Sequence, residues 1–321
     1  MAGRPIARTS IVGLNEIMDR VDLRHEFWNL SALLPHLEAD VVLEWCARRR
    51  LVKNELRCEN CNDHCSLVRY IQGADGYRWC CNKCGTRKSV RHGSFFTGSH
   101  LSIKQIIIII YCWACDMPQL QMSREAGQID KSIVTDWCNF LREECAQWNE
   151  THAMIIGGVD ENFEPIVVEI DESKYFHRKY HRGQWREGHW VFGGVERESG
   201  RCFLVEVPDR RAATLEQCIV QHILPGSHII SDGWAAYANI PQIGQGIYSH
   251  SVIVHQQNFV DPLDPEIHTQ NIENLWMRAK RKLKRQFGTS GALFQSYLDE
   301  FIYRNSMREE DIFFQHAGND W

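Results

Sequence analysis

Two pairs of closely spaced cysteines constrain this chain of 321 residues more than any other feature of its sequence. Cys58 and Cys61 form one C-x-x-C motif, Cys81 and Cys84 form a second, and 19 residues separate the two. Motifs at this spacing are typical of zinc ribbons, in which each motif supplies two thiolates to one tetrahedral ion. A closed shell of four sulfur ligands leaves no position for water, so the spacing predicts a structural zinc ion rather than a catalytic one.

Other residues near these motifs leave the ligand set open. Cys65 follows His64, and Cys80 directly precedes Cys81. A set of small buried cysteines without a metal is the structural alternative. A redox role is less favoured, because no thioredoxin-like strand–helix pattern surrounds either motif. The chain has 13 cysteines and no secretion signal, which favours reduced thiols and metal ligands over a disulfide framework.

The composition is that of an ordinary globular protein, with 44% hydrophobic and 24% charged residues. A net charge of −5 excludes a protein that is basic overall, although it permits local basic patches. The longest apolar run, residues 106–115, is too short to span a bilayer. The N-terminal residues contain no apolar core of a secretory signal. We therefore expect a soluble intracellular protein that is neither secreted nor bound to a membrane.

Changes of sequence pattern along the chain predict five segments. They are a helical lead-in over 1–54, a zinc ribbon over 55–98, a helix-turn-helix-like segment over 99–150, an α/β domain over 160–305 and a C-terminal tail over 306–321. Within the α/β part, strands are expected at 166–170, 190–195, 202–207 and 228–231, and helices at 212–223 and 272–287. A hairpin followed by helix, strand and helix indicates a mixed α/β fold.

Three helical stretches follow the cysteine motifs, at 101–116, 123–127 and 132–145. Ser102 is the expected cap of the first. The last can serve as a recognition helix, with Lys131, Ser132 and Thr135 near the base edges of DNA. A plain three-helix packing unit explains the same pattern, and the residues alone favour that simpler interpretation.

Three acidic residues of the α/β part stand at the ends of predicted elements. Asp171 and Asp232 each end an apolar strand, and Glu273 lies in the first turn of a helix. Adjacent strands would bring the aspartates to one sheet edge, and a helix laid across that edge would add the glutamate. Oxygen ligands of this kind suit Mg²⁺ or Mn²⁺, and two such ions about 4 Å apart support phosphodiester chemistry. Helix capping and a helix-dipole interaction are the structural alternatives.

Cationic residues flank these carboxylates. On the helix that begins near Glu273, they are Lys280 and Lys284 on about one face, with Arg278, Arg281, Lys282 and Arg285 nearby. After Asp171 they are Lys174, Arg178, Lys179 and Arg182, interleaved with aromatic residues. Both stretches would suit a DNA backbone, and the aromatic residues would allow stacking on bases. A solvated basic helix face is the alternative.

Several motifs, taken together, resemble the Merlin-type DDE transposases, which are eukaryotic relatives of bacterial insertion-sequence transposases with an ISXO-like domain. They are IDESKYFHRKYHRGQWREGHWVFGGVER, VPDRRAATLEQCI, PGSHIISDGWAAY and FVDP…HTQNIENLWMRAKRKLK, in this order. The upstream segment CNKCGTRKSVRHGSFFTGSHLSIKQI is similar to the zinc-ribbon segment of the same family. The resemblance extends from about residue 55 to about residue 305.

The resemblance implies an RNase H-like catalytic domain over 160–305 with a triad of Asp171, Asp232 and Glu273 that binds Mg²⁺ or Mn²⁺. His268 and Asn271, within the last motif, would position either DNA or the helix of the glutamate. His255 stands where the histidine of a Val-Asn-His element is expected, but the preceding residue is valine instead of asparagine.

The predicted function is that of a DNA transposase with a structural zinc ion. A metal-activated water would cut DNA at the terminal repeats, and the freed 3′-hydroxyl would then attack target DNA. The family likeness implies a homodimer or larger assembly, and location in the nucleus of a eukaryotic host or otherwise in the cytoplasm. A domesticated DNA-binding protein without catalytic activity is the alternative. A stand-alone RNase H-like nuclease is disfavoured, because it needs neither the ribbon nor the helix-turn-helix.

Overall fold

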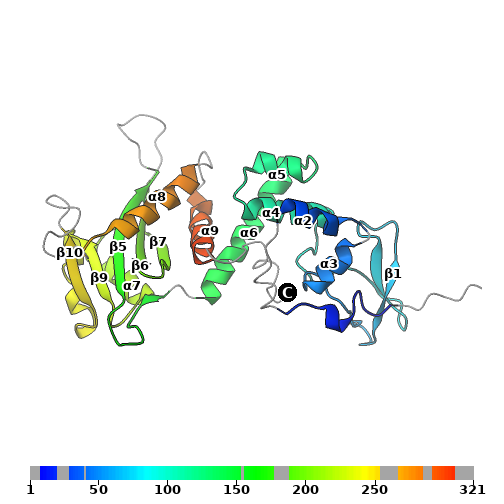
Figure 1. Ribbon diagram of the computed structural model, residues 1–321, viewed down its shortest axis with the longest axis horizontal. Coiled ribbons are helices and arrows are strands. Elements are labelled where there is room, and N and C mark those ends of the chain that lie inside the picture. The colour runs from blue at the N-terminus through cyan, green and yellow to red at the C-terminus, as the bar shows by residue number, and fades with distance from the viewer. Residues whose placement is uncertain are drawn as a thin grey trace, which may run out of the picture. The chain divides into compact units, whose positions relative to one another are not determined.

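The structure, a computed structural model, describes residues 8–19, 29–39, 41–152, 155–176, 188–253, 267–284 and 291–307. The chain forms two compact units, and the division falls within helix α6 (Lys131–Thr151) (Figure 1). The first unit comprises residues 1–141 and 309–321, and the second comprises 142–308. In the parts of the chain that are described, no helix is both long and apolar enough to cross a membrane. The finer division into five segments stays a prediction.

A three-stranded antiparallel sheet carries the cysteine motifs of the first unit. Its strands are β1 (Cys65–Arg69), β2 (Tyr77–Cys81) and β3 (Arg87–Ser89), paired in that order. Each C-x-x-C motif is a tight turn: Asn62 N donates to Cys58 O at 2.8 Å, and Gly85 N donates to Cys81 O at 3.0 Å. Asn62 and Gly85 have φ angles of 57° and 77°, a left-handed conformation that asparagine and glycine tolerate best.

Helices precede and follow this sheet in the sequence. Before it come the 3-10 turns Leu14–Glu16 and Leu34–Leu37 and the helices α2 (Leu30–Leu33) and α3 (Val42–Arg48); after it come α4 (Ile103–Ala114), α5 (Gln119–Glu125) and the first part of α6. Ser102 caps α4 as predicted: its hydroxyl accepts from the amide of Gln105 at 3.2 Å, and the Gln105 side chain accepts from the Ser102 amide at 3.0 Å. All five isoleucines at 106–110 are buried. Helix α5 begins earlier than expected, and α6 extends further.

The second unit contains a five-stranded mixed sheet. Its strands are β5 (Val167–Tyr175), β6 (His189–Glu196), β7 (Cys202–Val207), β9 (His228–Asp232) and β10 (Ser249–Ile253), in the spatial order β10-β9-β5-β6-β7. Strands β5, β6 and β7 are antiparallel neighbours, whereas β9 and β10 run parallel to β5. A short parallel pair, β4 (Ile156–Gly157) and β8 (Ile223–Leu224), stands apart from this sheet. The strand order and directions are those of an RNase H-like fold, and they confirm the expected mixed α/β class.

Alternating side chains of this sheet bury one apolar core on each face. On one face, Val168, Ile170 and Phe192 pack with α7 (Ala212–His222) and with the 3-10 turns Ala235–Tyr237 and Ile240–Gln245. The opposite face carries α8 (Gln270–Lys284) and α9 (Phe294–Ser306), the latter preceded by the 3-10 turn Gly291–Leu293. Figure 1 shows α8 lying across the sheet.

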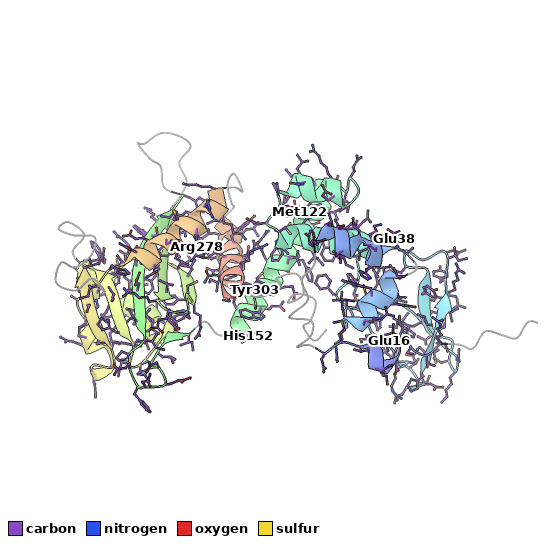
Figure 2. The ribbon with its side chains drawn as sticks, viewed as in Figure 1. Glu16, Glu38, Met122, His152, Arg278 and Tyr303 are labelled. Carbon is purple, nitrogen blue, oxygen red and sulfur yellow. The ribbon has the colours of Figure 1, made fainter. Side chains whose placement is uncertain are left out.

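Helix α9 also packs against the end of α6 within the second unit. The ring of Trp148 meets that of Tyr303 edge-on, with 5.3 Å between the centroids, and Asn149 donates to the backbone carbonyl of Asp299 at 2.9 Å. Figure 2 labels Tyr303, which is on α9, and His152, which directly follows α6. These contacts explain why α6 continues beyond the predicted end at residue 145.

One strand boundary differs from the expectation that a strand ends at Asp171. Strand β5 continues to Tyr175, because Ser173 and Tyr175 also lie on the face covered by α8 and both are buried. Among the residues named from the sequence, Arg178, Lys179, Arg182, His255 and Arg285 lie outside the described part of the chain.

Candidate functional site

The four predicted cysteines converge on one point of the first unit. The Sγ atoms of Cys58 and Cys84 are 3.3 Å apart, and those of Cys61 and Cys81 are 3.5 Å apart. All four Sγ atoms lie within 4.8 Å of one another. Zinc–sulfur bonds of about 2.3 Å in a tetrahedron place the sulfur atoms roughly 3.8 Å apart. The cluster can therefore hold one metal ion, and its all-thiolate donor set fits zinc.

The geometry also settles the position of the two neighbouring cysteines. Across β1 and β2, Cys65 pairs with Cys81 and Cys80 pairs with Ser66, but neither thiol joins the cluster found among the described residues. Side-chain and backbone hydrogen bonds from Thr86 lower the pKa of Cys84 to about 6. At Cys61, despite a backbone hydrogen bond at Asp63, the hydrogen bond with Cys81 and burial raise the pKa to about 12. The shift toward the thiolate, which is the form that binds metals, therefore holds for Cys84 and not for every thiol of the cluster.

Parallel pairing of β5 and β9 brings Asp171 and Asp232 level with each other. The pairs Val167–His228, Val168–Ile229 and Glu169–Ile230 define the register, and the same offset places Asp171 opposite Asp232. Because side chains alternate along a strand, both carboxyl groups belong to the face of the sheet that α8 covers. The sequence predicted this juxtaposition from the strand ends alone.

Asp171 lies in surroundings that disfavour its charge. Burial raises its pKa to about 7, and repulsion from Glu172 and Asp232 adds to the increase. The indole N–H of Trp276 donates to Asp171 Oδ2 at 3.0 Å and partly offsets this effect. Trp276 reaches Asp171 because Gly193, the β6 partner of Asp171, has no side chain: a Cβ atom there would lie 2.7 Å from the Trp276 ring.

Glu273 lies in the first turn of α8, as the sequence predicted, and its side chain is exposed. Trp276 and Lys280 follow it at i+3 and i+7 on the same helix edge and both contact β5, where Lys280 donates to the hydroxyl of Ser173. Glu273 is therefore on the edge that adjoins the strand. For the residues described, however, only the cysteines gather their ligand atoms within 4.8 Å, so the three carboxylates do not meet at that distance.

A fourth acidic residue, Glu169, holds the start of α8. Its side chain is 0% exposed, and its Oε2 atom accepts from the backbone amides of Asn271 at 2.9 Å and Ile272 at 3.0 Å. The Asn271 side chain and the Arg197 guanidinium both donate to Oε1, at 2.7 Å and 2.9 Å. Glu169 is not among the site residues that the sequence predicts. Its signal is a charge inside an apolar strand, two positions before Asp171 and thus on the same face.

The residues predicted to contact DNA have different surroundings. Asn271 bonds to Glu169, and His268 Nδ1 lies 3.4 Å from Glu169 Oε1, which favours the helix-positioning role for both. Lys174 lies over the ring of Trp190, 5.2 Å from its centroid, on the face away from α8. Lys284 is exposed at the end of α8, whereas Lys280 of the same predicted basic face is half-buried and donates to Ser173.

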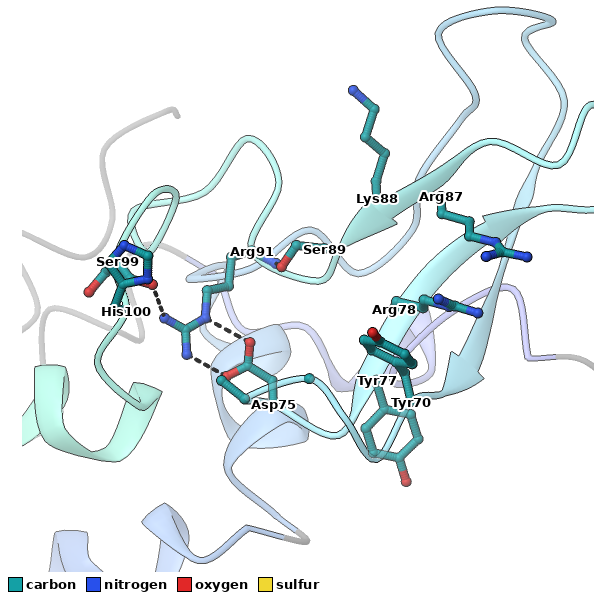
Figure 3. Close-up of a pocket in the computed structure, with 12 residues that line it drawn as sticks. Tyr70, Asp75, Tyr77, Arg78, Arg87, Lys88, Ser89, Arg91, Ser99 and His100 are labelled. Carbon is teal, nitrogen blue, oxygen red and sulfur yellow. Dashed lines mark hydrogen bonds and ion pairs between the residues drawn. The ribbon is translucent and has the colours of Figure 1, made fainter.

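A basic hollow of about 370 Å³ opens on the sheet of the first unit (Figure 3). Arg78 and Arg87 extend into it from the paired strands β2 and β3, and the Arg78 guanidinium stacks over Tyr70 at 4.3 Å. Neither arginine pairs with a carboxylate of the described residues. The other cations are engaged: Arg91 with Asp75 at 2.6 Å, and Lys88 with Glu59 at 2.8 Å.

The second unit is thus an RNase H-like domain with two aspartates on the adjoining strands β5 and β9. Residues 159–306 match the family model described as the ISXO2-like transposase domain. The matched range lies wholly within the second unit, and it supports the transposase family that the motifs resembled. It does not separate the Merlin-type subgroup from other members.

Solved structures similar to the chain include retroviral integrases. The catalytic core domain of BIV integrase gives a TM-score of 0.28 at 14% identity, over 44% of this chain and 80% of that one. The HTLV-2 integrase catalytic core domain in complex with magnesium gives 0.30 at 13% identity, over 43% and 84%. An intasome of simian T-cell lymphotropic virus gives 0.29 at 14% identity, over 61% and 67%. A comparison with the curated proteins gives no match. The fold assignment rests on the strand order and directions.

Replacing Cys81 by serine is expected to remove the metal ion and unfold the first unit, because metal binding and folding are coupled in such sites. Cys80→Ser is the matched control, since the neighbouring thiol is outside the cluster. Zinc content and thermal unfolding of the two purified variants provide the measurement. A Cys81 variant with full zinc content, or equal losses in both variants, would contradict this ligand set.

The raised pKa of Asp171 predicts a pH-dependent stability. In the unfolded chain the group titrates at about 3.9, whereas in the folded protein it titrates at about 7. Between these values the folded state binds the additional proton, so Asp171 lowers stability progressively as the pH rises through this range. Asp171→Asn is therefore expected to stabilise the protein at pH 8 by on the order of 3 kcal/mol, and much less at pH 5.

Urea unfolding at both pH values, without magnesium or manganese, tests this expectation. Asp209→Asn is the control with the opposite sign, since hydrogen bonds from Arg211 and Thr214 lower the pKa of Asp209. A stabilisation by Asp171→Asn that is equal at the two pH values would mean that the carboxyl group titrates normally.

Proposed function

We propose that the chain is a DNA transposase whose second unit cuts and joins DNA at the ends of a mobile element. Asp171, Asp232 and Glu273 would hold Mg²⁺ or Mn²⁺. The observation that carries this proposal is the parallel register of β5 and β9, which, continued by two residues, sets Asp171 opposite Asp232 in a domain that matches the ISXO2-like transposase domain. The hard oxygen donors of the three residues fit such cations.

Divalent ions at this position would supply Lewis-acid stabilisation of the attacking and leaving oxygens. The protein's own contribution is charge and position. Asp171, with its pKa raised to about 7, must release a proton before its carboxylate can act as a ligand. The N–H of Trp276 orients one oxygen of that carboxylate, and Gly193 provides the space for the indole.

The reaction needs no nucleophile from the protein. In the first step, a water oxygen bonds to phosphorus and the bond from phosphorus to the 3′-oxygen breaks, which leaves a free 3′-hydroxyl and a 5′-phosphate. In the second step, that hydroxyl bonds to phosphorus in target DNA and one bridging P–O bond breaks. In-line displacements of this kind depend on positioning and charge neutralisation, which fits a site of carboxylates.

Each unit offers surfaces of its own for DNA. In the second unit, Lys284 is exposed at the end of α8. In the first, Lys131 and Ser132 are exposed at the start of α6, as a recognition helix requires, and Arg78 and Arg87 flank the basic hollow. The proposal further includes a structural zinc ion on the cysteines, an assembly of two or more copies that joins two element ends, and nuclear location in a eukaryotic host.

Asp232→Asn is expected to lower the rate of DNA cleavage by orders of magnitude and to leave DNA binding intact. The substitution preserves size but removes the charge that holds a hard cation, and metal assistance lowers the barrier by several kcal/mol. The measurement uses labelled DNA with the element's own ends, incubated with Mg²⁺, with Mn²⁺ and without either ion. Asp160→Asn, an exposed aspartate in a turn of the same unit, is the control that should cut normally.

Two outcomes would overturn this assignment. Wild-type cleavage without any divalent ion would remove the metal mechanism. A wild-type protein that binds the ends but never cuts them, with either ion, would favour the domesticated DNA-binding protein instead.

Replacing Arg78 and Arg87 together by alanine is expected to weaken DNA binding and to reduce its salt dependence. Each lost phosphate contact lowers the slope of log affinity against log salt by about one, so the pair should remove up to about two. Lys88→Ala is the matched control, because this neighbouring lysine is already paired with Glu59. Titrations of fluorescent DNA at several salt concentrations give the slopes. An unchanged slope in the double variant would show that the hollow does not contact DNA.

A further inference from the structure

We infer that Glu169 is a positioning residue, which sets where Glu273 stands relative to Asp171 and thereby controls how well the site binds a divalent cation. The inference rests on the proposed function, because it takes Asp171 and Glu273 as ligands. Glu169 would itself touch neither the ion nor DNA. Its role follows from how it joins helix α8 to strand β5.

Helix α8 is capped by a residue of a strand that is distant in the sequence. The initial backbone N–H groups of a helix lack partners within it, and a side chain next to the helix start usually accepts from them. Here Glu169 Oε2 accepts from the amides of Asn271 and Ile272 at 2.9 Å and 3.0 Å, across 102 and 103 positions of the sequence. A carboxylate at this end of a helix also interacts favourably with the helix dipole.

The Glu169 carboxylate is buried, and both of its oxygen atoms accept hydrogen bonds. Glu169 is 0% exposed, and Arg197 donates to its Oε1 atom through Nε at 3.1 Å and through a terminal nitrogen at 2.9 Å. The same arginine nitrogen donates to the backbone carbonyl of His268 at 3.2 Å. Three segments are tied together in this way: β5, the turn after β6 and the residues before α8. A buried ion pair of this kind is costly to disrupt, so it fixes the geometry firmly.

Only a few residues separate this cap from the proposed metal ligands. Asp171 lies two residues beyond Glu169 on the same face of β5, or about 7 Å along the strand. Glu273 directly follows Ile272, whose amide bonds to Glu169. Further along, Trp276 bonds to Asp171 and Lys280 bonds to Ser173, so α8 follows the same face of β5. Of these contacts, only that of Glu169 lies in the helical turn of Glu273.

Glu169→Gln in the full chain tests this role. The glutamine keeps the shape but places an amide donor among groups that are themselves donors, which should loosen the first turn of α8. Loss of a partner that orients metal ligands typically lowers metal affinity by about 10–100-fold, and we expect a loss in this range for Mn²⁺. Mn²⁺ binding to the zinc-loaded protein, measured by electron paramagnetic resonance, gives the affinity.

Glu196→Gln is the matched control for a purely structural effect. Glu196 is 6% exposed on the same sheet and accepts from the amide of Gly157 at 2.8 Å and from Ser199 at 2.7 Å. Its contacts are therefore away from α8, and its variant should lose thermal stability without losing Mn²⁺ affinity. If Glu169→Gln fails to fold, Arg197→Lys keeps the charge but loses the two-point contact, and it should show a smaller loss in the same direction.

A double-mutant cycle with Glu273→Gln shows whether Glu169 acts through Glu273. If it does, Glu169→Gln causes little further loss of Mn²⁺ affinity once Glu273 is replaced. Losses that multiply across the two substitutions would overturn the inference. So would a Glu169 variant that binds Mn²⁺ as tightly as the wild type. A wild-type protein that binds no Mn²⁺ would refute the proposed function and this inference together.

Discussion

The parallel pairing of β5 with β9 is the constraint on which the second unit depends. Ile170 and Ile229 are both 0% exposed in the core beneath α7, and their burial leaves the intervening positions to the opposite face. A slip of one residue would exchange the faces of every side chain in the strand, and it would place Asp171 within the apolar core. The hydrophobic cores therefore fix the register, and the register brings the two aspartates together.

Helix α8 is attached to the sheet by two kinds of contact with different consequences. Its apolar residues, such as Leu275 and Ala279, bury the helix against the sheet, but apolar contacts are non-directional and specify position along the strand only weakly. The hydrogen bonds to Glu169, Asp171 and Ser173 are directional and fix that position. Apolar burial thus supplies the attraction, whereas the polar contacts determine which residues of helix and strand face each other.

Local patterns in the sequence predicted much of the arrangement. Spacing alone identified the four clustered cysteines, and apolar runs located the strands that carry Asp171 and Asp232. Features that depend on distant partners were missed. The capping role of Glu169 requires knowledge that α8 starts beside it. The need for glycine at 193 arises from the close approach of Trp276, which is distant in the sequence, and of Leu204, which is on a neighbouring strand. The extension of β5 to Tyr175 likewise depends on cover from α8, which no local pattern reveals.

At the proposed site, a proton and a divalent cation would compete for the Asp171 carboxylate. Near neutral pH its carboxyl group retains a proton in part of the molecules, which limits the repulsion among neighbouring acids while no cation is present. A cation that bound there would have to displace this proton, so binding would release acid into solution and would weaken as the surroundings acidify. The same burial that shelters the carboxylate from water would thus make protons and metal ions compete for one position.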